Sequence, residues 1–232
     1  MAKLAPRHRL ARTSVVDRDA ALIELCRDRR VLDLACAAWP ATERWCQDQS
    51  LLHMRLRRVC RDLAGFDICP AAIEIMRRHG IDNLYEVDLL DAEAVSEAWG
   101  RLTFQPDIVL AGELIEHLDN PGQLLRNCRA HMQQASRFMI TVPNAFSVTN
   151  WLHVLSGYEK VAADHVAYYS ETNLKELATR GGFELDSIRW YRYSNHNSWG
   201  HRIVALATKP LLFLRPQLAD GLIAEYRPVS PT

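Results

Sequence analysis

The alternation of short apolar runs with longer amphipathic runs is the feature of this sequence that most restricts its fold. Seven apolar runs have the length of buried strands: residues 30–35, 63–68, 84–89, 107–112, 137–143, 183–193 and 221–227. Amphipathic stretches predict helices at residues 17–28, 42–60, 70–80, 92–102, 120–132 and 170–182. Strands and helices that alternate in this way form a parallel sheet covered by helices. We therefore expect an α/β fold with a seven-stranded, mostly parallel sheet and helices on both faces.

The length and charge of the chain narrow the class of protein. A chain of 232 residues suffices for one domain with its own core. Its 28 basic and 28 acidic residues cancel, which argues against a nucleic-acid partner, because phosphate binding needs an excess of Lys and Arg. Six cysteines without a Cys-x-x-Cys pair are typical of reduced thiols. The apolar run near the C-terminus is interrupted by charged residues and prolines, so no membrane span or membrane partner is expected.

From these observations we expect a single cytoplasmic domain over residues 1–232. Residues 1–28 are expected to form an N-terminal helical cap. Residues 144–169 are long for a strand-to-helix loop, and we expect them to be an insertion on the substrate side. The sequence leaves open whether the chain forms a homodimer.

Acidic residues mark the ends of three predicted strands. Asp33 and Asp67 lie near the ends of the first two strands, and Asp88 lies near the end of the third. Carboxyl ends of parallel strands meet at one edge of a sheet, where ligands bind. An acid that closes the second strand is suited to a ribose diol, and one after the third strand can accept from an adenine amino group. Each acid is also a common turn former or helix cap.

At these positions the chain resembles the class I S-adenosylmethionine (SAM) dependent methyltransferases. The resemblance covers about residues 20–195 and rests on VLDLAC (31–36), GFDICPAAIEIMRRHGI (65–81), VDLLD (87–91), PDIVLAGELIEHLDNPGQLL (106–125), ITVPN (140–144) and GGFE (181–184). It implies a Rossmann-like fold in which residues 221–227 form an antiparallel edge strand. It also implies SAM as cofactor, bound by Asp33, Ala35, Cys36, Ala37, Asp67, Ile68, Asp88, Leu89 and Gly112.

The loop after the first predicted strand departs from the pattern of that family. Ala35 to Trp39 replace a Gly-x-Gly run, and alanine tolerates positive φ and close backbone approach less well than glycine. SAM carries no phosphate, so backbone amides at 35–37 can still contact its methionine part. Trp39 then either faces the sulfonium or packs under the following helix. A scaffold that has lost the cofactor is the alternative that this loop permits.

The stretch GELIEHL, residues 112–118, suggests a metal. If it is helical, Glu113, Glu116 and His117 share one face. Crowded carboxylates need a positive partner, and Mg²⁺ or Mn²⁺ suits oxygen ligands joined by a histidine. With His165 in a later loop, the pattern Glu-x-x-Glu-His…His resembles metal-dependent methyltransferases, which include small-RNA 2′-O-methyltransferases and ubiquinone-pathway O-methyltransferases. That resemblance implies Glu113, Glu116, His117 and His165 as metal ligands.

A hydroxyl acceptor suits this set of residues. A metal can lower the pKa of a bound hydroxyl and hold it in line with the methyl group, or a histidine can act as a general base without metal. His165, His117 and Glu113 are the candidate catalytic residues. We expect methyl transfer to a small-molecule or sugar-like acceptor, in natural-product or polysaccharide biosynthesis, with Trp151, Tyr158, Tyr168 and Tyr169 lining its pocket. The alternatives are an RNA 2′-O-methyltransferase and a non-catalytic scaffold.

Overall fold

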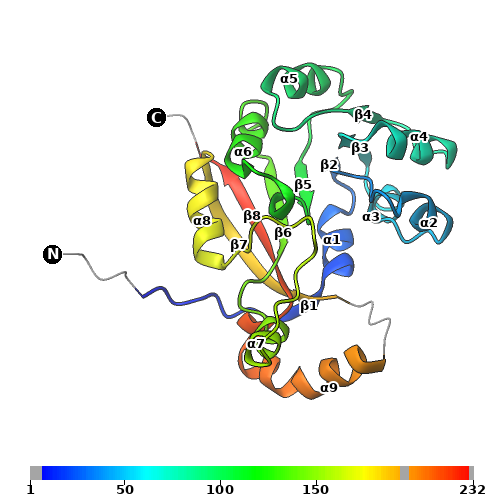
Figure 1. Ribbon diagram of the computed structural model, residues 1–232. Coiled ribbons are helices and arrows are strands. Elements are labelled where there is room, and N and C mark those ends of the chain that lie inside the picture. Colours follow the sequence, from blue (N-terminus) through cyan, green and yellow to red (C-terminus); the bar gives the residue numbers. More distant parts are fainter. Residues whose placement is uncertain (1–6, 194–198, 230–232) are drawn as a thin grey trace.

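Eight strands form one twisted sheet between two layers of helices in the computed structural model, which describes residues 7–193 and 199–229, without the side chains of 199–205 (Figure 1). The strands are β1 (Val15–Asp17), β2 (Arg30–Leu34), β3 (Asp62–Asp67), β4 (Leu84–Glu86), β5 (Ile108–Gly112), β6 (Arg137–Pro143), β7 (Phe183–Arg192) and β8 (Gly221–Pro228). Their order is β1-β7-β8-β6-β5-β2-β3-β4. The mostly parallel α/β sheet is confirmed, with the short β1 as an eighth strand that the sequence analysis missed.

Strand β8 is the antiparallel member of the sheet. It pairs antiparallel with both β6 and β7, whereas the other neighbouring strands pair in parallel. The prediction of an antiparallel last strand is confirmed, but its position at the edge of the sheet is wrong. The residues of β8 are largely buried and apolar, as expected for an interior strand with both faces covered. Strands β1 and β4 occupy the edges instead.

Helices cover both faces of the sheet. They are α1 (Arg18–Cys26), α2 (Thr42–Gln47), α3 (Leu52–Arg57), α4 (Pro70–Arg78), α5 (Ala92–Gly100), α6 (Pro121–Arg129), α7 (Val148–Leu155), α8 (Glu171–Arg180) and α9 (Trp199–Leu214), with the 3₁₀ turns η1 (Ile115–His117) and η2 (Pro216–Leu218). Leu22 of α1 and Leu56 of α3 belong to one buried cluster with β2, β5 and β6. Val95 of α5, Leu124 of α6 and Leu174 of α8 belong to the larger cluster with the same strands. Alternate residues of each strand therefore face different helical layers.

Three predicted helical segments differ from the structure. The predicted helix over residues 42–60 divides into α2 and α3, because Gln49 has a φ of 54° and the N–H groups of Ser50 and Leu51 turn back to the carbonyl of Trp45. In the N-terminal cap, helix α1 is preceded by β1, which joins the sheet. The predicted helix over GELIEHL is the single 3₁₀ turn η1, since Glu113 has a φ of 52°.

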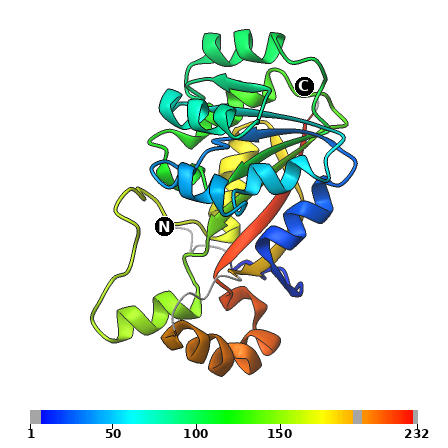
Figure 2. The same cartoon turned by 90° about the vertical axis from the view of Figure 1, so that its right-hand side faces the viewer.

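Two helices that the sequence analysis did not predict lie at one end of the molecule. Helix α7 belongs to the long segment 144–169, and α9 contains Pro210 in its interior. Both views place α7 and α9 side by side, beyond the end of the sheet (Figures 1 and 2). In the described part of the chain, no helix combines the length and apolarity needed to cross a membrane.

The chain turns back at β2, and this places a crevice over the middle of the sheet. From β2 the chain adds β3 and β4 on one side, whereas β5 and β6 lie on the other. The loops that follow β2 and β5 therefore leave the same edge in opposite directions. Ligands bind at such a switch point in open α/β sheets.

Candidate functional site

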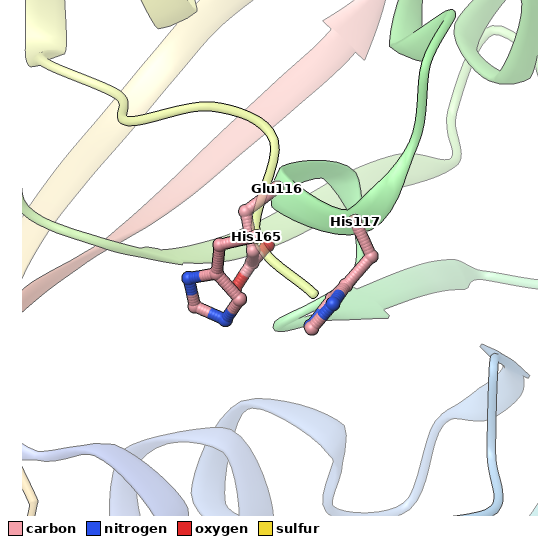
Figure 3. A group of neighbouring side chains, drawn as sticks. All are labelled: Glu116, His117 and His165. Atoms are coloured by element: carbon pink, nitrogen blue, oxygen red, sulfur yellow. The ribbon is translucent and has the colours of Figure 1, made fainter. Parts of the chain in front are cut away.

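Glu116, His117 and His165 form a compact cluster at the carboxyl end of β5 (Figure 3). One ligand atom from each residue lies within 4.8 Å of the others. Glu116 and His117 come from η1, and His165 comes from the loop between α7 and α8. The backbone N–H of Val166 donates to the Glu116 carbonyl at 2.8 Å, which holds that loop against the turn. Residues separated by about fifty positions in the sequence therefore meet in one place.

The buried carboxylate of this cluster lacks a hydrogen-bond partner in the described part of the chain. Glu116 is fully buried, and neither of its carboxylate oxygens has a hydrogen-bond partner among the described residues. Burial, followed by the nearby Glu113 carboxylate, raises the pKa of Glu116 to about 8. Burial and the adjacent His117 ring lower the pKa of His165 below its usual value. A buried carboxylate without such a partner, beside two imidazole rings of which that of His165 favours its neutral form, is a donor set that fits a divalent cation.

A further carboxylate fixes the orientation of His117. Its Nδ1 atom lies 3.2 Å from an Asp164 oxygen, and its ring meets the His165 ring edge-on at a centroid distance of 4.6 Å. Carboxylates in contact with a ligating imidazole set the ring orientation and the tautomer in metal sites. Asp164, which the sequence analysis did not single out, therefore belongs to the cluster.

Glu113 lies apart from the cluster, in a polar network of its own. Its carboxylate accepts hydrogen bonds from Tyr191 at 2.6 Å, from Thr141 at 3.1 Å and from Tyr193. The Nε atom of Arg18 lies 3.8 Å from it. The expected shared face of Glu113, Glu116 and His117 does not form, because η1 is a single turn and Glu113 precedes it in the left-handed region.

The two tyrosines of this network are site residues that the sequence analysis missed. Burial raises the pKa of both Tyr191 and Tyr193, so their hydroxyls stay protonated and donate to Glu113. They stand two residues apart at the end of β7, and strand residues at that spacing share a face. That spacing, at a predicted strand end, is the signal that could have indicated them. Arg18, at the start of α1, has no comparable signal in the sequence.

The loop after β2 is held by hydrogen bonds within the protein. The N–H of Cys36 donates to the Phe66 carbonyl at 3.2 Å, and that of Ala37 donates to Asp67 at 2.9 Å. Two of the amides expected to contact the methionine part of SAM are thus already bonded. Ala35 has a φ of 52°, the conformation that a glycine would adopt more readily. Trp39 is 58% exposed, so it does not pack under the following helix.

Asp33 is a structural support beneath this loop. Its carboxylate lies 2.9 Å from Nδ1 of His53 in α3, and both side chains are buried. Cys36 is also buried, and burial raises the pKa of its thiol well above the usual value. The loop therefore rests on a hydrogen-bonded pair that links β2 to α3, and His53 is a core residue.

The end of β3 carries two more of the expected cofactor residues, Asp67 and Ile68. Asp67 is nearly buried and accepts the N–H of Cys69 as well as that of Ala37, one on each carboxylate oxygen. A carboxylate has about four acceptor positions, so two are left for a ribose diol. Ile68 is 64% exposed directly beside Asp67 and offers an apolar surface to a flat ring. These two residues fit the adenosine half of SAM.

The expected cofactor residues at the ends of β4 and β5 lie in different surroundings. Asp88 is exposed, and one of its oxygens accepts the N–H of Leu90, while Leu89 is buried. Gly112 ends β5, and a Cβ there would lie 3.0 Å from the Arg18 guanidinium. The expected cofactor residues thus line one edge of the sheet over β2 to β5, next to the histidine cluster.

The aromatic residues expected around an acceptor lie in different surroundings. Tyr169 is buried, and its hydroxyl donates to the Ile115 carbonyl at 3.2 Å. Tyr168 donates to the carbonyl of Lys160. Trp151 is 53% and Tyr158 is 73% exposed. Tyr169 therefore holds η1 through its hydrogen bond to Ile115, and Trp151 and Tyr158 lie on the surface.

Comparisons with known proteins agree with this geometry. A family model described as a methyltransferase domain matches residues 6–188. A ubiquinone biosynthesis O-methyltransferase from Bordetella avium is 23% identical over 172 residues, which span 72% of this chain and 66% of that protein. Its counterpart in Xanthomonas oryzae is 23% identical over 50% of this chain and 43% of its own length. The chain thus spans about two thirds or less of these relatives.

Solved structures show the same fold at low identity. A SAM dependent methyltransferase from Archaeoglobus fulgidus has a TM-score of 0.55 and 18% identity, covering 90% of this chain and 91% of its own. Magnesium protoporphyrin IX methyltransferase from Synechocystis, solved with bound SAH, has a TM-score of 0.56 and 11% identity. It covers 91% of this chain and 82% of its own.

Proposed function

The chain belongs to the methyltransferase domain family and has the class I fold, and from that premise we propose that it transfers a methyl group from SAM to a hydroxyl of a small-molecule or sugar-like acceptor. SAM would lie over the ends of β2 to β5, with Asp67 and Ile68 at its adenosine half. Asp33 and the loop at Ala35 to Ala37 would shape the methionine end. Asp88, Leu89 and Gly112 complete this edge of the sheet.

The observation that carries the acceptor side is the buried Glu116 carboxylate without a partner. Glu116, His117 and His165 would hold a divalent ion such as Mg²⁺ or Mn²⁺, whose chemistry is to lower the pKa of a bound hydroxyl. Asp164 orients His117, and the bond from Val166 to Glu116 keeps His165 at the cluster. Burial keeps His165 neutral near pH 7, the form that binds a metal or takes a proton.

Glu113 would act beside the cluster rather than in it. Its carboxylate is held by Tyr191 and Tyr193, next to the Arg18 guanidinium. At the end of β5 these groups offer hydrogen bonds and charge to an acceptor that carries several polar substituents. This favours a polar small molecule or a sugar over an unsubstituted alcohol.

Hydroxyl methylation has support in the names of the relatives, which are O-methyltransferases of a biosynthetic pathway. An RNA acceptor is less consistent with a chain of zero net charge. Natural-product or polysaccharide biosynthesis remains the broad setting that we propose for this chain.

Titration calorimetry with SAM and S-adenosylhomocysteine tests the cofactor. We expect both to bind, and absence of binding at millimolar concentration would assign the chain to the non-catalytic scaffold. Mn²⁺ binding to His165→Ala, compared with the wild type and with His153→Ala, tests the metal separately. We expect only His165→Ala to lose affinity for Mn²⁺. If EDTA leaves the rate of methyl transfer by the wild type unchanged, the metal is refuted.

A further inference from the structure

The end of the molecule formed by α7, α9 and residues 7–14 carries many exposed large apolar side chains, and we call it the apolar end. These side chains are Trp151, Leu152, Val154 and Leu155 of α7 and Leu206, Leu211, Phe213 and Leu214 of α9. Leu155 of α7 is 77% and Phe213 of α9 is 85% exposed. Exposed apolar side chains on two helices that lie side by side mark an interaction site in a folded protein.

The part of helix α9 whose side chains are described, residues 206–214, turns apolar side chains away from the protein. Leu206, Pro210 and Phe213 recur at helical spacing on one side, and all three are exposed. Thr208 and Leu212, on the other side of the helix, are buried against the body. A helix on the surface of a globular protein normally presents polar residues outward, so the outward face of α9 needs a partner of its own.

Helix α7 projects in a similar way. Val148 at its start is buried, whereas Trp151, Leu152, Val154 and Leu155 are all exposed. At 100° per residue these four side chains fall within one arc of about 160°. A lipid interface can take up a broad apolar face of this kind.

Basic residues outnumber acidic ones around the apolar end. The sequence contains no Asp or Glu in residues 1–16, 121–158 and 187–219, although the whole chain has equal numbers of acids and bases. Lys209 and Arg215 are exposed on and after α9, and Arg9 and Arg12 are exposed on the N-terminal stretch. That stretch lies against η2, because the carbonyl of Ala11 accepts from the side chain of Gln217 at 2.8 Å.

Acidic groups at the border of this end are few. Glu171 accepts the N–H of Ala11, and Asp220 lies 3.7 Å from Arg192. Glu159 and the exposed Asp164 follow α7 in the same loop. The exposed apolar side chains are thus accompanied mainly by Lys and Arg, which is the pattern of helices that lie in a membrane interface.

We propose that the apolar end docks on the surface of an anionic lipid bilayer. The side chains of Trp151, Leu155 and Phe213 enter the boundary between headgroups and acyl chains, and Lys209 and Arg215 contact the lipid phosphates. A second copy of the chain is a poorer partner, because a two-fold contact through this end would bring like charges together. The helices lie in the interface and do not cross the bilayer.

Co-sedimentation of the full chain with vesicles tests this proposal. We expect binding to phosphatidylcholine vesicles that contain phosphatidylglycerol, and weaker binding to pure phosphatidylcholine or in high salt. Phe213→Glu and Leu155→Glu should each weaken binding by about tenfold or more, because each removes an apolar side chain that docking would bury in the bilayer. Lys209→Glu should weaken binding to the anionic vesicles by about fivefold or more, the loss expected from one basic contact.

Matched controls separate docking from folding. Val229→Glu and Lys175→Glu change an exposed apolar and an exposed basic residue elsewhere, and neither should affect vesicle binding. Circular dichroism checks that all variants are folded. Equal binding by Phe213→Glu and the wild type would overturn the proposal, as would a dimer in solution that Phe213→Glu dissociates. Binding to soluble polyglutamate without binding to vesicles would assign the surface to an acidic protein and would also overturn it.

Discussion

Replacing Glu116 by glutamine makes the sharpest test of the metal site, because two opposite effects are expected from one substitution. The carboxylate of Glu116 has an ordinary pKa of 4.5 and a pKa of about 8 in the fold, raised first by burial. A raised pKa means that the folded state prefers the protonated acid. The stability from this preference is complete below pH 4.5 and is lost as the pH rises toward 8.

The size of this loss of stability follows from the difference between the two pKa values of Glu116. At 1.36 kcal/mol for each pKa unit, the metal-free protein loses up to about 5 kcal/mol between pH 4.5 and 8. That is a large part of the 5–15 kcal/mol typical of a folded domain, in order of magnitude about a third or more. Glu116→Gln has no charge to desolvate, so its stability should change much less over this range.

Urea unfolding at pH 5 and pH 8, in EDTA and in Mn²⁺, measures both effects. In EDTA at pH 8 we expect Glu116→Gln to be more stable than the wild type. Mn²⁺ should stabilise the wild type at pH 8 and leave Glu116→Gln unchanged, since a metal bound only by the folded state stabilises it by mass action. Glu97→Gln, an exposed glutamate of α5, is the control. A wild type as stable at pH 8 as at pH 5 in EDTA would refute the reasoning.

Three other substitutions test the fold and the Glu113 network. Tyr191→Phe removes a donor to Glu113 and should lower the free energy of unfolding by about 2 kcal/mol, with S-adenosylhomocysteine affinity unchanged in calorimetry. Ala35→Gly should raise the free energy of unfolding in urea by up to about 1 kcal/mol, because Ala35 has a positive φ. Ala71→Gly, at an exposed position of helix α4, should lower it by about as much. Asp107→Asn should lower the melting temperature at pH 7, because hydrogen bonds from Arg30 lower the pKa of Asp107 in the folded state. A lowered pKa contributes stability that is present above pH 3.8 and is lost as the pH falls below it. Ala35→Gly that destabilises like Ala71→Gly, or an Asp107→Asn deficit that persists at pH 2, would contradict these expectations.

The regular elements were predictable where the sequence marks their ends. Pro70 and Pro121 occupy the first turns of α4 and α6, and Ser170 with Asn173 forms the capping box that begins α8. These residues act through the backbone next to them, so they are visible in a single sequence. The strands were predictable because buried parallel strands are continuously apolar.

The candidate site was predictable in its residue types and less so in its geometry. Glu116, His117 and His165 lie together, as the motif suggests. The position of Glu113 depends on its own positive φ, which no neighbouring residue in the sequence indicates. The partners of Glu113 come from β7 and α1, which are distant in the sequence. Long-range contacts of this kind leave no local pattern, and the same holds for the pair of His53 with Asp33.

The interior position of β8 has a consequence for the order in which the chain can fold. Among the described strands, β7 is paired to the rest of the sheet through β8, and β1 is paired through β7. During synthesis, β2 to β6 can pair as they leave the ribosome, but β1, although made early, has no place in the sheet until residue 228 is available. We therefore expect folding to finish late and in one step, with the longest loop closure in the chain deciding its rate.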